Sequence, residues 1–88
     1  VKAFDLSAEA LDRIAKDGAQ RAQSIADAAR GVDVVVTMVP TGAESRAVYL
    51  GEHGIIASAD KGALLVDSST IDVETARAII AEANKAGF

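Results

Sequence analysis

Cysteine and tryptophan are absent from this 88-residue sequence, and proline occurs once. Without cysteine, the chain has neither a disulfide framework nor a thiolate metal site, and no His/Asp/Glu cluster has metal-ligand spacing. The nine Lys and Arg are scattered among thirteen Asp and Glu, and the net charge is −4, so the clustered positive surface that nucleic acid requires is missing. No apolar run reaches the roughly 18 residues of a membrane span, and no signal peptide opens the chain. We expect a soluble, cytoplasmic-type domain (mitochondrial matrix in a eukaryote) with no nucleic acid or membrane partner.

Hydrophobic residues make up half of the sequence, mostly as Ala, Val and Ile, and strand signals alternate with helix signals along its whole length. We predict strands over residues 1–6, 19–22, 33–39 and 63–67. We predict helices from a cap at Ser7 to Gly18, then over residues 25–30, 43–50, 55–60 and 73–86, with Phe88 opening a further strand. Such alternation is typical of right-handed crossovers and a parallel sheet with flanking helices, an α/β fold.

Two burial expectations follow from this pattern. The strand 33–39 (DVVVTMV) is β-branched and nearly continuous, so we expect it to be covered on both faces. On the last helix, the periodicity predicts one inward face, made of Val73, Ala76, Ile79, Ile80 and Ala83. Ligands of open parallel sheets bind beyond the carboxyl ends of the strands, which here are residues 5–7, 38–41 and 67–70.

The residues at and between these strand ends resemble a known family. Phe4-Asp5-Leu6, TMVPT at 37–41, VYLG at 48–51 and DSSTID at 67–72 are similar to the 3-hydroxyisobutyrate dehydrogenases of the β-hydroxyacid dehydrogenase family. The resemblance implies an NAD-dependent oxidoreductase that transfers hydride between NAD and a short 3-hydroxy acid. For those relatives the reaction converts 3-hydroxyisobutyrate to methylmalonate semialdehyde in valine breakdown; tartronate semialdehyde reductases share the layout.

Two elements of that family are not found in these residues. The glycine-rich GxGxxG turn after the first strand is absent, as is the catalytic lysine of a later helical domain. The resemblance therefore implies that residues 1–88 are an internal part of a Rossmann-type NAD-binding domain, inactive alone, from a parent enzyme expected to be a homo-oligomer. Without the first strand, the strands at 1–6 and 33–39 would have unpaired edges and a gap between them.

Asp5, at the end of the first predicted strand, is the candidate adenosine-ribose ligand. A carboxylate there accepts hydrogen bonds from ribose hydroxyls and repels a 2′-phosphate, which favours NAD over NADP. No arginine follows within the next few residues to receive such a phosphate. A capping or turn role for Asp5 is the structural alternative.

The segments after the next two long strands carry the other candidates. The resemblance assigns Val39 and Pro40 to the nicotinamide-ribose side, although a plain strand stop also explains the proline. It assigns Glu44 to a cofactor contact in the first helical turn, where relatives often have Asn. Thr70 is assigned to the cofactor and Ser69 to the substrate side, with a Ser/Thr turn as the alternative.

The remaining polar residues suggest no chemistry of their own. Asp67 is expected to brace the turn that follows its strand, and His53 is expected to be a solvated loop residue. A receiver-like signalling module would need a phosphoacceptor Asp where this chain has Pro40 and Thr41. A non-catalytic interaction domain with the same fold stays open as an alternative.

Overall fold

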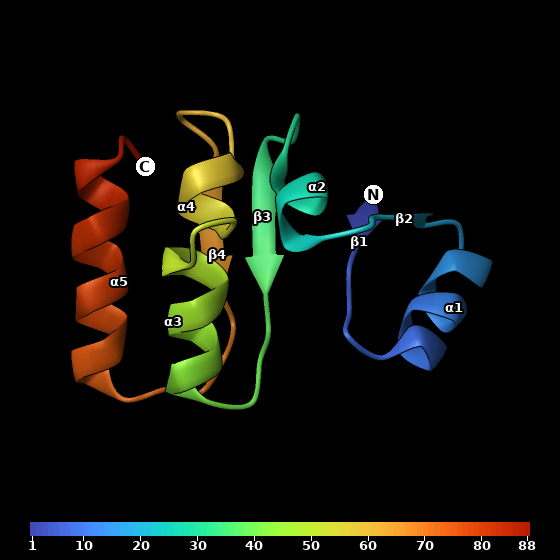
Figure 1. Ribbon diagram of the computed structural model, residues 1–88, viewed down its shortest axis with the longest axis horizontal. Coiled ribbons are helices and arrows are strands. Elements are labelled where there is room, and N and C mark those ends of the chain that lie inside the picture. The colour runs from blue at the N-terminus through green and yellow to red at the C-terminus, as the bar shows by residue number, and fades with distance from the viewer.

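The computed structural model describes all of residues 1–88 and contains four strands and five helices in an alternating order (Figure 1). The strands are β1 (Lys2–Ala3), β2 (Gln20–Arg21), β3 (Val34–Thr37) and β4 (Leu64–Asp67). The helices are α1 (Ala8–Lys16), α2 (Ile25–Ala29), α3 (Gly42–Leu50), α4 (Ile55–Ser58) and α5 (Val73–Lys85). The four strands and five helices predicted over residues 1–86 are confirmed, and the strands are shorter than expected; the further strand predicted to begin at Phe88 is absent.

The strands form two separate parallel pairs. β1 pairs with β2, and β3 pairs with β4 in the register Val34↔Leu64 to Thr37↔Asp67. No hydrogen bonds join β1 to β3, so each pair keeps a free edge. The expected gap is therefore confirmed. It also explains why β1 is only two residues long, since Phe4 and the residues after it have no strand beside them and turn toward α1.

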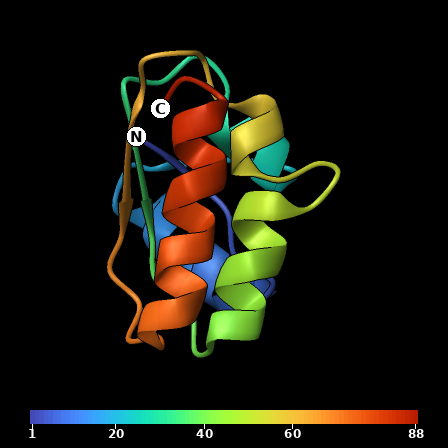
Figure 2. The same ribbon diagram turned by 90° about the vertical axis from the view of Figure 1, so that its left-hand side faces the viewer.

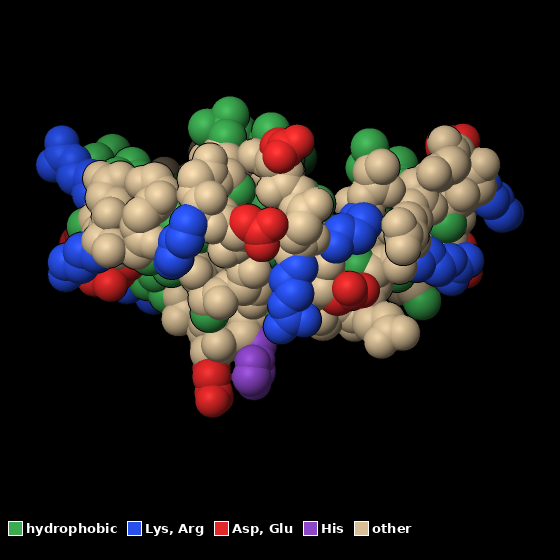
Figure 3. Space-filling model, turned by 90° about the horizontal axis from the view of Figure 1, so that it is seen from above, with side chains coloured by type: hydrophobic (Ala, Val, Ile, Leu, Met, Phe, Trp, Pro, Cys, Tyr) green, Lys and Arg blue, Asp and Glu red, His purple; other side chains and the backbone are tan.

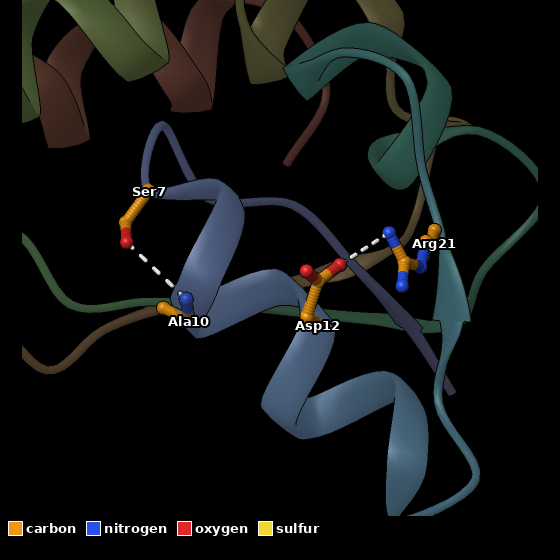
Figure 4. A network of polar contacts seen from close by, with 4 residues as sticks. All are labelled: Ser7, Ala10, Asp12 and Arg21. Atoms are coloured by element: carbon orange, nitrogen blue, oxygen red, sulfur yellow. Dashed lines mark hydrogen bonds and ion pairs between the residues drawn. The ribbon is translucent and has the colours of Figure 1, made fainter.

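Side-chain caps fix where the helices begin. The Ser7 hydroxyl accepts the Ala10 N–H at 3.2 Å at the start of α1, and Asp72 accepts the Thr75 N–H at 2.9 Å at the start of α5. Gly18 ends the α1 turn at φ +102°, a conformation that favours glycine. Figure 4 shows the Ser7 cap together with the ion pair between Asp12 of α1 and Arg21 of β2. Such an exposed pair contributes little to stability, about 0–1 kcal/mol.

The core lies between the helices and one face of the β3–β4 pair. In Figure 2, α3, α4 and α5 all lie on the same side of these two strands. The buried cluster contains Ala29, Tyr49, Ile55, Ala59 and Ile79, and the inward side chains of β3 and β4, Val35 and Leu65, pack against it. Through Ala29, α2 packs with α3, α4 and α5 in this cluster. The same packing places the ends of β3 and β4 beside the start of α3.

The other face of the β3–β4 pair is open, contrary to the expectation of strands covered on both faces. Val34, Val36 and Leu64 are 48%, 65% and 60% exposed, and Val66 is also exposed. From above, hydrophobic side chains gather along one margin over the region of β3 and β4, while acidic and basic side chains are interspersed elsewhere on that face (Figure 3). The physical reason is that every helix packed on this pair lies on its opposite side.

The predicted inward face of α5 is only partly correct. Ile79 is buried and belongs to the core, whereas Val73 and Ile80 are largely exposed. α5 packs against α3 through the face that carries Ile79. Ile80 and Val73 lie roughly 100–120° around the helix axis from Ile79, so they are not covered. Phe88 forms no strand; its ring lies 4.8 Å from the Lys61 ammonium. No helix combines the length and apolar character needed to cross a bilayer.

We predict that a polypeptide of residues 1–88 alone associates through its free strand edges and open apolar face. Sedimentation velocity should show a mass that rises with concentration, and thermal unfolding should be broad. The double variant Val36→Lys/Val66→Lys, which leaves the helix-covered face unchanged, should associate less. A monomer with a sharp, concentration-independent melting transition would contradict this prediction.

Candidate functional site

Three segments of the chain leave the strands at one edge of the molecule, the lower edge in Figure 1. They are residues 4–7 after β1, 38–41 after β3 and 68–72 after β4. The last two lie side by side, because the Ser68 N–H donates to the Thr37 carbonyl at 2.8 Å. The first stands apart, beyond the space between β1 and β3 (Figure 1). The predicted carboxyl-end cluster is thus present as two joined segments and one separate one.

A hydrogen-bonded carboxylate lies directly beneath the two joined segments. Asp67 Oδ1 accepts the Thr37 hydroxyl at 3.1 Å and the Ser69 N–H at 3.0 Å, while Oδ2 accepts the hydroxyl of the fully buried Ser45 at 3.1 Å. Asp67 therefore connects β3, α3 and the segment after β4. The expectation that it braces the following turn is confirmed.

Tyr49 extends this network into the core. Its phenol lies 2.8 Å from the Thr37 hydroxyl. Because Thr37 gives its single proton to Asp67, the Tyr49 phenol is the donor in this pair. Burial raises the pKa of Tyr49, the hydrogen bond with Thr37 opposes the rise, and the nearby charge of Asp67 adds to it. The phenol thus stays protonated and keeps its donor role.

The pKa of Asp67 is lowered from its ordinary value. Burial alone would raise the pKa, but the hydrogen bonds from Ser69, Ser45 and Thr37 outweigh the burial because they favour the ionised form. No basic side chain pairs with this carboxylate, so its negative charge is stabilised by hydroxyl and amide donors. Its orientation is consequently fixed by three partners.

Asp5 has a structural role that leaves part of its carboxylate available. Oδ1 accepts the Ser7 N–H at 2.7 Å, which is the turn role considered as the alternative. Oδ2 has no hydrogen-bond partner within the chain, and the side chain is exposed. The residue is thus held in place by one oxygen and offers the other to a ligand. Its ribose contact stays a prediction.

Val39 and Ser69 are joined to one another, whereas Pro40 and Thr70 are exposed. The Val39 N–H donates to the Ser69 hydroxyl oxygen at 2.8 Å, which links the segment after β3 to the segment after β4. The Thr70 side chain makes no hydrogen bond within the chain and is free to contact a ligand. These polar groups fit a dinucleotide: Asp5 Oδ2 can accept a hydrogen bond from a ribose hydroxyl, and the Thr70 hydroxyl can donate to or accept from a polar group. Cofactor roles for these residues stay predictions.

Glu44 is engaged in a capping box at the start of α3. Its Oε2 accepts the Thr41 N–H at 3.1 Å, and the Thr41 hydroxyl oxygen accepts the Glu44 N–H at 3.3 Å. This contact gives the acidic side chain of Glu44 a structural role at the start of α3. The cofactor contact predicted for Glu44 would have to share the same carboxylate.

The starts of α3 and α5 lie against each other behind these segments. A side chain at Gly42 would place its Cβ 2.8 Å from Asp72 Oδ1 and 3.4 Å from Thr75 Cγ2. Hydrogen bonds with the backbone N–H and side chain of Thr75 lower the pKa of Asp72, slight burial opposes this, and Arg46 adds a weaker lowering. The close approach at Gly42 thus sets the spacing of the two helices beside the site.

Sequence reasoning missed the hydrogen-bond network behind the site, which Thr37, Ser45 and Tyr49 form with Asp67. Thr37 and Tyr49 are each a lone polar group within an apolar stretch, and a buried polar group of this kind needs a partner. Ser45 lies between Glu44 and Arg46, so the sequence carries no such signal for it. For Thr37 and Tyr49 that pattern was the available signal, but it does not identify which partner each side chain has. The partners come from different elements, β3, α3 and β4, whose register the sequence leaves open.

The paired parallel strands, their crossover helices and the polar strand ends define an α/β domain of the Rossmann type. The chain belongs to the family described as the NAD binding domain of 6-phosphogluconate dehydrogenase, which matches residues 1–88. The predicted fold and the NAD expectation are thereby confirmed at the level of the family.

Individual relatives agree with this assignment. The chain is 45% identical over 82 residues to the probable mitochondrial 3-hydroxyisobutyrate dehydrogenase of Dictyostelium discoideum, covering 93% of this chain and 26% of that protein. It is 38% identical to the NAD-dependent L-serine dehydrogenase of Pseudomonas aeruginosa, covering 97% and 28%. A solved structure of Mycobacterium tuberculosis 3-hydroxyisobutyrate dehydrogenase with L-serine superimposes with a TM-score of 0.92 at 37% identity, covering 99% and 29%. The chain thus spans less than a third of the length of these relatives.

We predict that Gly42→Ala destabilises the protein that contains this chain by about 1–3 kcal/mol. Alanine favours helices more than glycine does, but its Cβ would meet Asp72 and force α3 and α5 apart. The melting temperature should fall, and Ala43→Ser at the exposed neighbouring position should change it little. A melting temperature equal to or above that of the wild type would contradict the prediction.

The lowered pKa of Asp67 predicts a specific loss of stability in acid. Its contribution is complete above the ordinary pKa of 3.8 and disappears as the pH falls through the lower pKa of the folded state. From about pH 4 downward, the free energy of unfolding should therefore fall more steeply for the wild type than for Asp67→Asn. Asp60→Asn removes an exposed carboxylate without side-chain hydrogen bonds and serves as the control. Equal slopes in the wild type and Asp67→Asn would contradict this account.

Proposed function

We propose that this chain is part of the NAD-binding domain of an NAD-dependent 3-hydroxyacid dehydrogenase. In this reaction the carbon that bears the alcohol gives a hydride to NAD and its hydroxyl loses a proton, so the alcohol becomes an aldehyde. The cofactor supplies the hydride chemistry, and the protein orients it and manages the proton. The observation that carries the proposal is the shared edge at which all three polar segments leave their strands, in a chain of this family.

The residues of that edge divide between the two ends of the dinucleotide. Asp5 would bind the adenosine ribose, while Val39, Pro40 and Thr70 would lie along the nicotinamide half with Ser69 on the substrate side. Glu44 would contact the cofactor only through the carboxylate that also caps α3. The proton-transfer group would come from outside residues 1–88, which offer no lysine at this edge.

Two 3-hydroxy acids have specific support as substrates. 3-Hydroxyisobutyrate, converted to methylmalonate semialdehyde in valine breakdown, is supported by the names of the Dictyostelium and Mycobacterium relatives. L-Serine is supported by the 38%-identical Pseudomonas L-serine dehydrogenase and by the L-serine in the Mycobacterium structure. Tartronate semialdehyde reduction is a third, sister reaction. We further propose a homo-oligomeric parent in the cytoplasm, or in the mitochondrial matrix of a eukaryote.

The full-length protein that contains this chain tests the proposal directly. NADH formation at 340 nm should follow the addition of NAD with 3-hydroxyisobutyrate or L-serine, and the larger kcat/KM identifies the substrate. Activity with NADP should be much weaker. Flat absorbance with every 3-hydroxy acid tried would contradict the proposal and favour a non-catalytic interaction domain.

Asp5→Ala should lower kcat/KM for NAD roughly tenfold to a hundredfold, the effect of losing hydrogen bonds to a charged group. The preference for NAD over NADP should also weaken, because the carboxylate that repels a 2′-phosphate is gone. Asp17→Asn, at the exposed end of α1, is the matched control and should behave as the wild type. Unchanged cofactor preference in Asp5→Ala would remove Asp5 from the site.

A further inference from the structure

Beyond the backbone contact of Ser68 with Thr37, a side-chain hydrogen bond through Ser69 joins the segment after β3 to the segment after β4. Ser69 accepts the Val39 N–H on its hydroxyl oxygen at 2.8 Å and donates its own N–H to Asp67 Oδ1 at 3.0 Å. This bridge connects residues 30 positions apart in the sequence. The position of Val39, and of Pro40 after it, therefore depends on where Ser69 is held.

Asp67 is in turn held from two further sides. Thr37 donates to Oδ1 from the end of β3, and the buried Ser45 donates to Oδ2 from α3. Donors on both oxygens leave the carboxylate one orientation, because rotation about its last bond would break at least one of these contacts. The chain of contacts from Ser45 through Asp67 and Ser69 to Val39 is thus continuous.

We propose that Asp67 is a positioning residue for the cofactor, which fixes the segments after β3 and β4 in one arrangement through Ser69 and so shapes the surface that the nicotinamide half contacts. This inference rests on the proposed function and goes beyond it, because Asp67 acts without touching the ligand. Ser69 then serves as the bridge to Val39, and the unpaired Thr70 side chain is left to contact the ligand.

The alternative is that the network only stabilises the fold. A variant of Tyr49 distinguishes this alternative from the positioning role. The Tyr49 phenol donates to Thr37 at the far end of the network, buried in the core. Tyr49→Phe removes this hydrogen bond but keeps the three contacts of Asp67 and the Ser69–Val39 bridge. It therefore reports what a loss of stability alone does to cofactor binding.

The experiment measures the dissociation constant of NADH by its fluorescence with the full-length protein, at a temperature where circular dichroism shows each variant to be folded. Asp67→Asn and Ser69→Ala should each weaken NADH binding about tenfold, which corresponds to about 1.4 kcal/mol. The double variant should be no weaker than either single variant, because both changes break one chain of contacts. Tyr49→Phe should melt at a lower temperature and bind NADH as the wild type does.

Three results would overturn the positioning role while leaving the proposed function intact. The first is NADH binding at the wild-type affinity by a folded Ser69→Ala variant. The second is a double variant in which the losses of NADH affinity from Asp67→Asn and Ser69→Ala add up. The third is a Tyr49→Phe variant that binds NADH as weakly as these two variants do. If Asp67→Asn does not fold, the comparison of Ser69→Ala with Tyr49→Phe decides alone. A wild-type protein that binds no NADH would overturn the proposed function and this inference together.

Discussion

The parallel pairing of β3 with β4 is the constraint on which the rest of this structure depends. Its register, from Val34↔Leu64 to Thr37↔Asp67, places Val35 and Leu65 on the face that the helices cover. It also places Thr37 opposite Asp67, so that the two side chains meet at the carboxyl ends of their strands. A shift of either strand by one residue would turn that strand's side chains to the opposite face, so Thr37 and Asp67 would no longer meet.

The helices cover only one face of the β3–β4 pair and leave the other exposed. This one face is enough to fix the polar segments that follow the two strands. The buried cluster around Tyr49, Ile55 and Ile79 fixes α3, α4 and α5 against β3 and β4. The Asp67 network then continues from this core to the strand ends without a break. The β1–β2 pair has no such connection through strand pairing, and Asp5 is positioned by its own turn with Ser7.

Local signals predicted most of the fold, and long-range contacts account for what they missed. Caps at Ser7 and Asp72 and the glycine after α1 located helix ends because each acts within a few residues. Strand lengths and the burial of Val36 and Ile80 depend on which neighbours are present, so periodicity alone overestimated both. At the site, the strand-end residues were predicted, but the contacts that join Val39 to Ser69 depend on the register of β3 and β4.

The most direct test is a crystal structure of the full-length protein with bound NAD. We expect the adenosine ribose within hydrogen-bond distance of Asp5 and the nicotinamide half along Val39, Pro40 and Thr70, with the Ser69–Val39 bridge intact. A dinucleotide bound away from the carboxyl ends of β1, β3 and β4 would contradict this expectation.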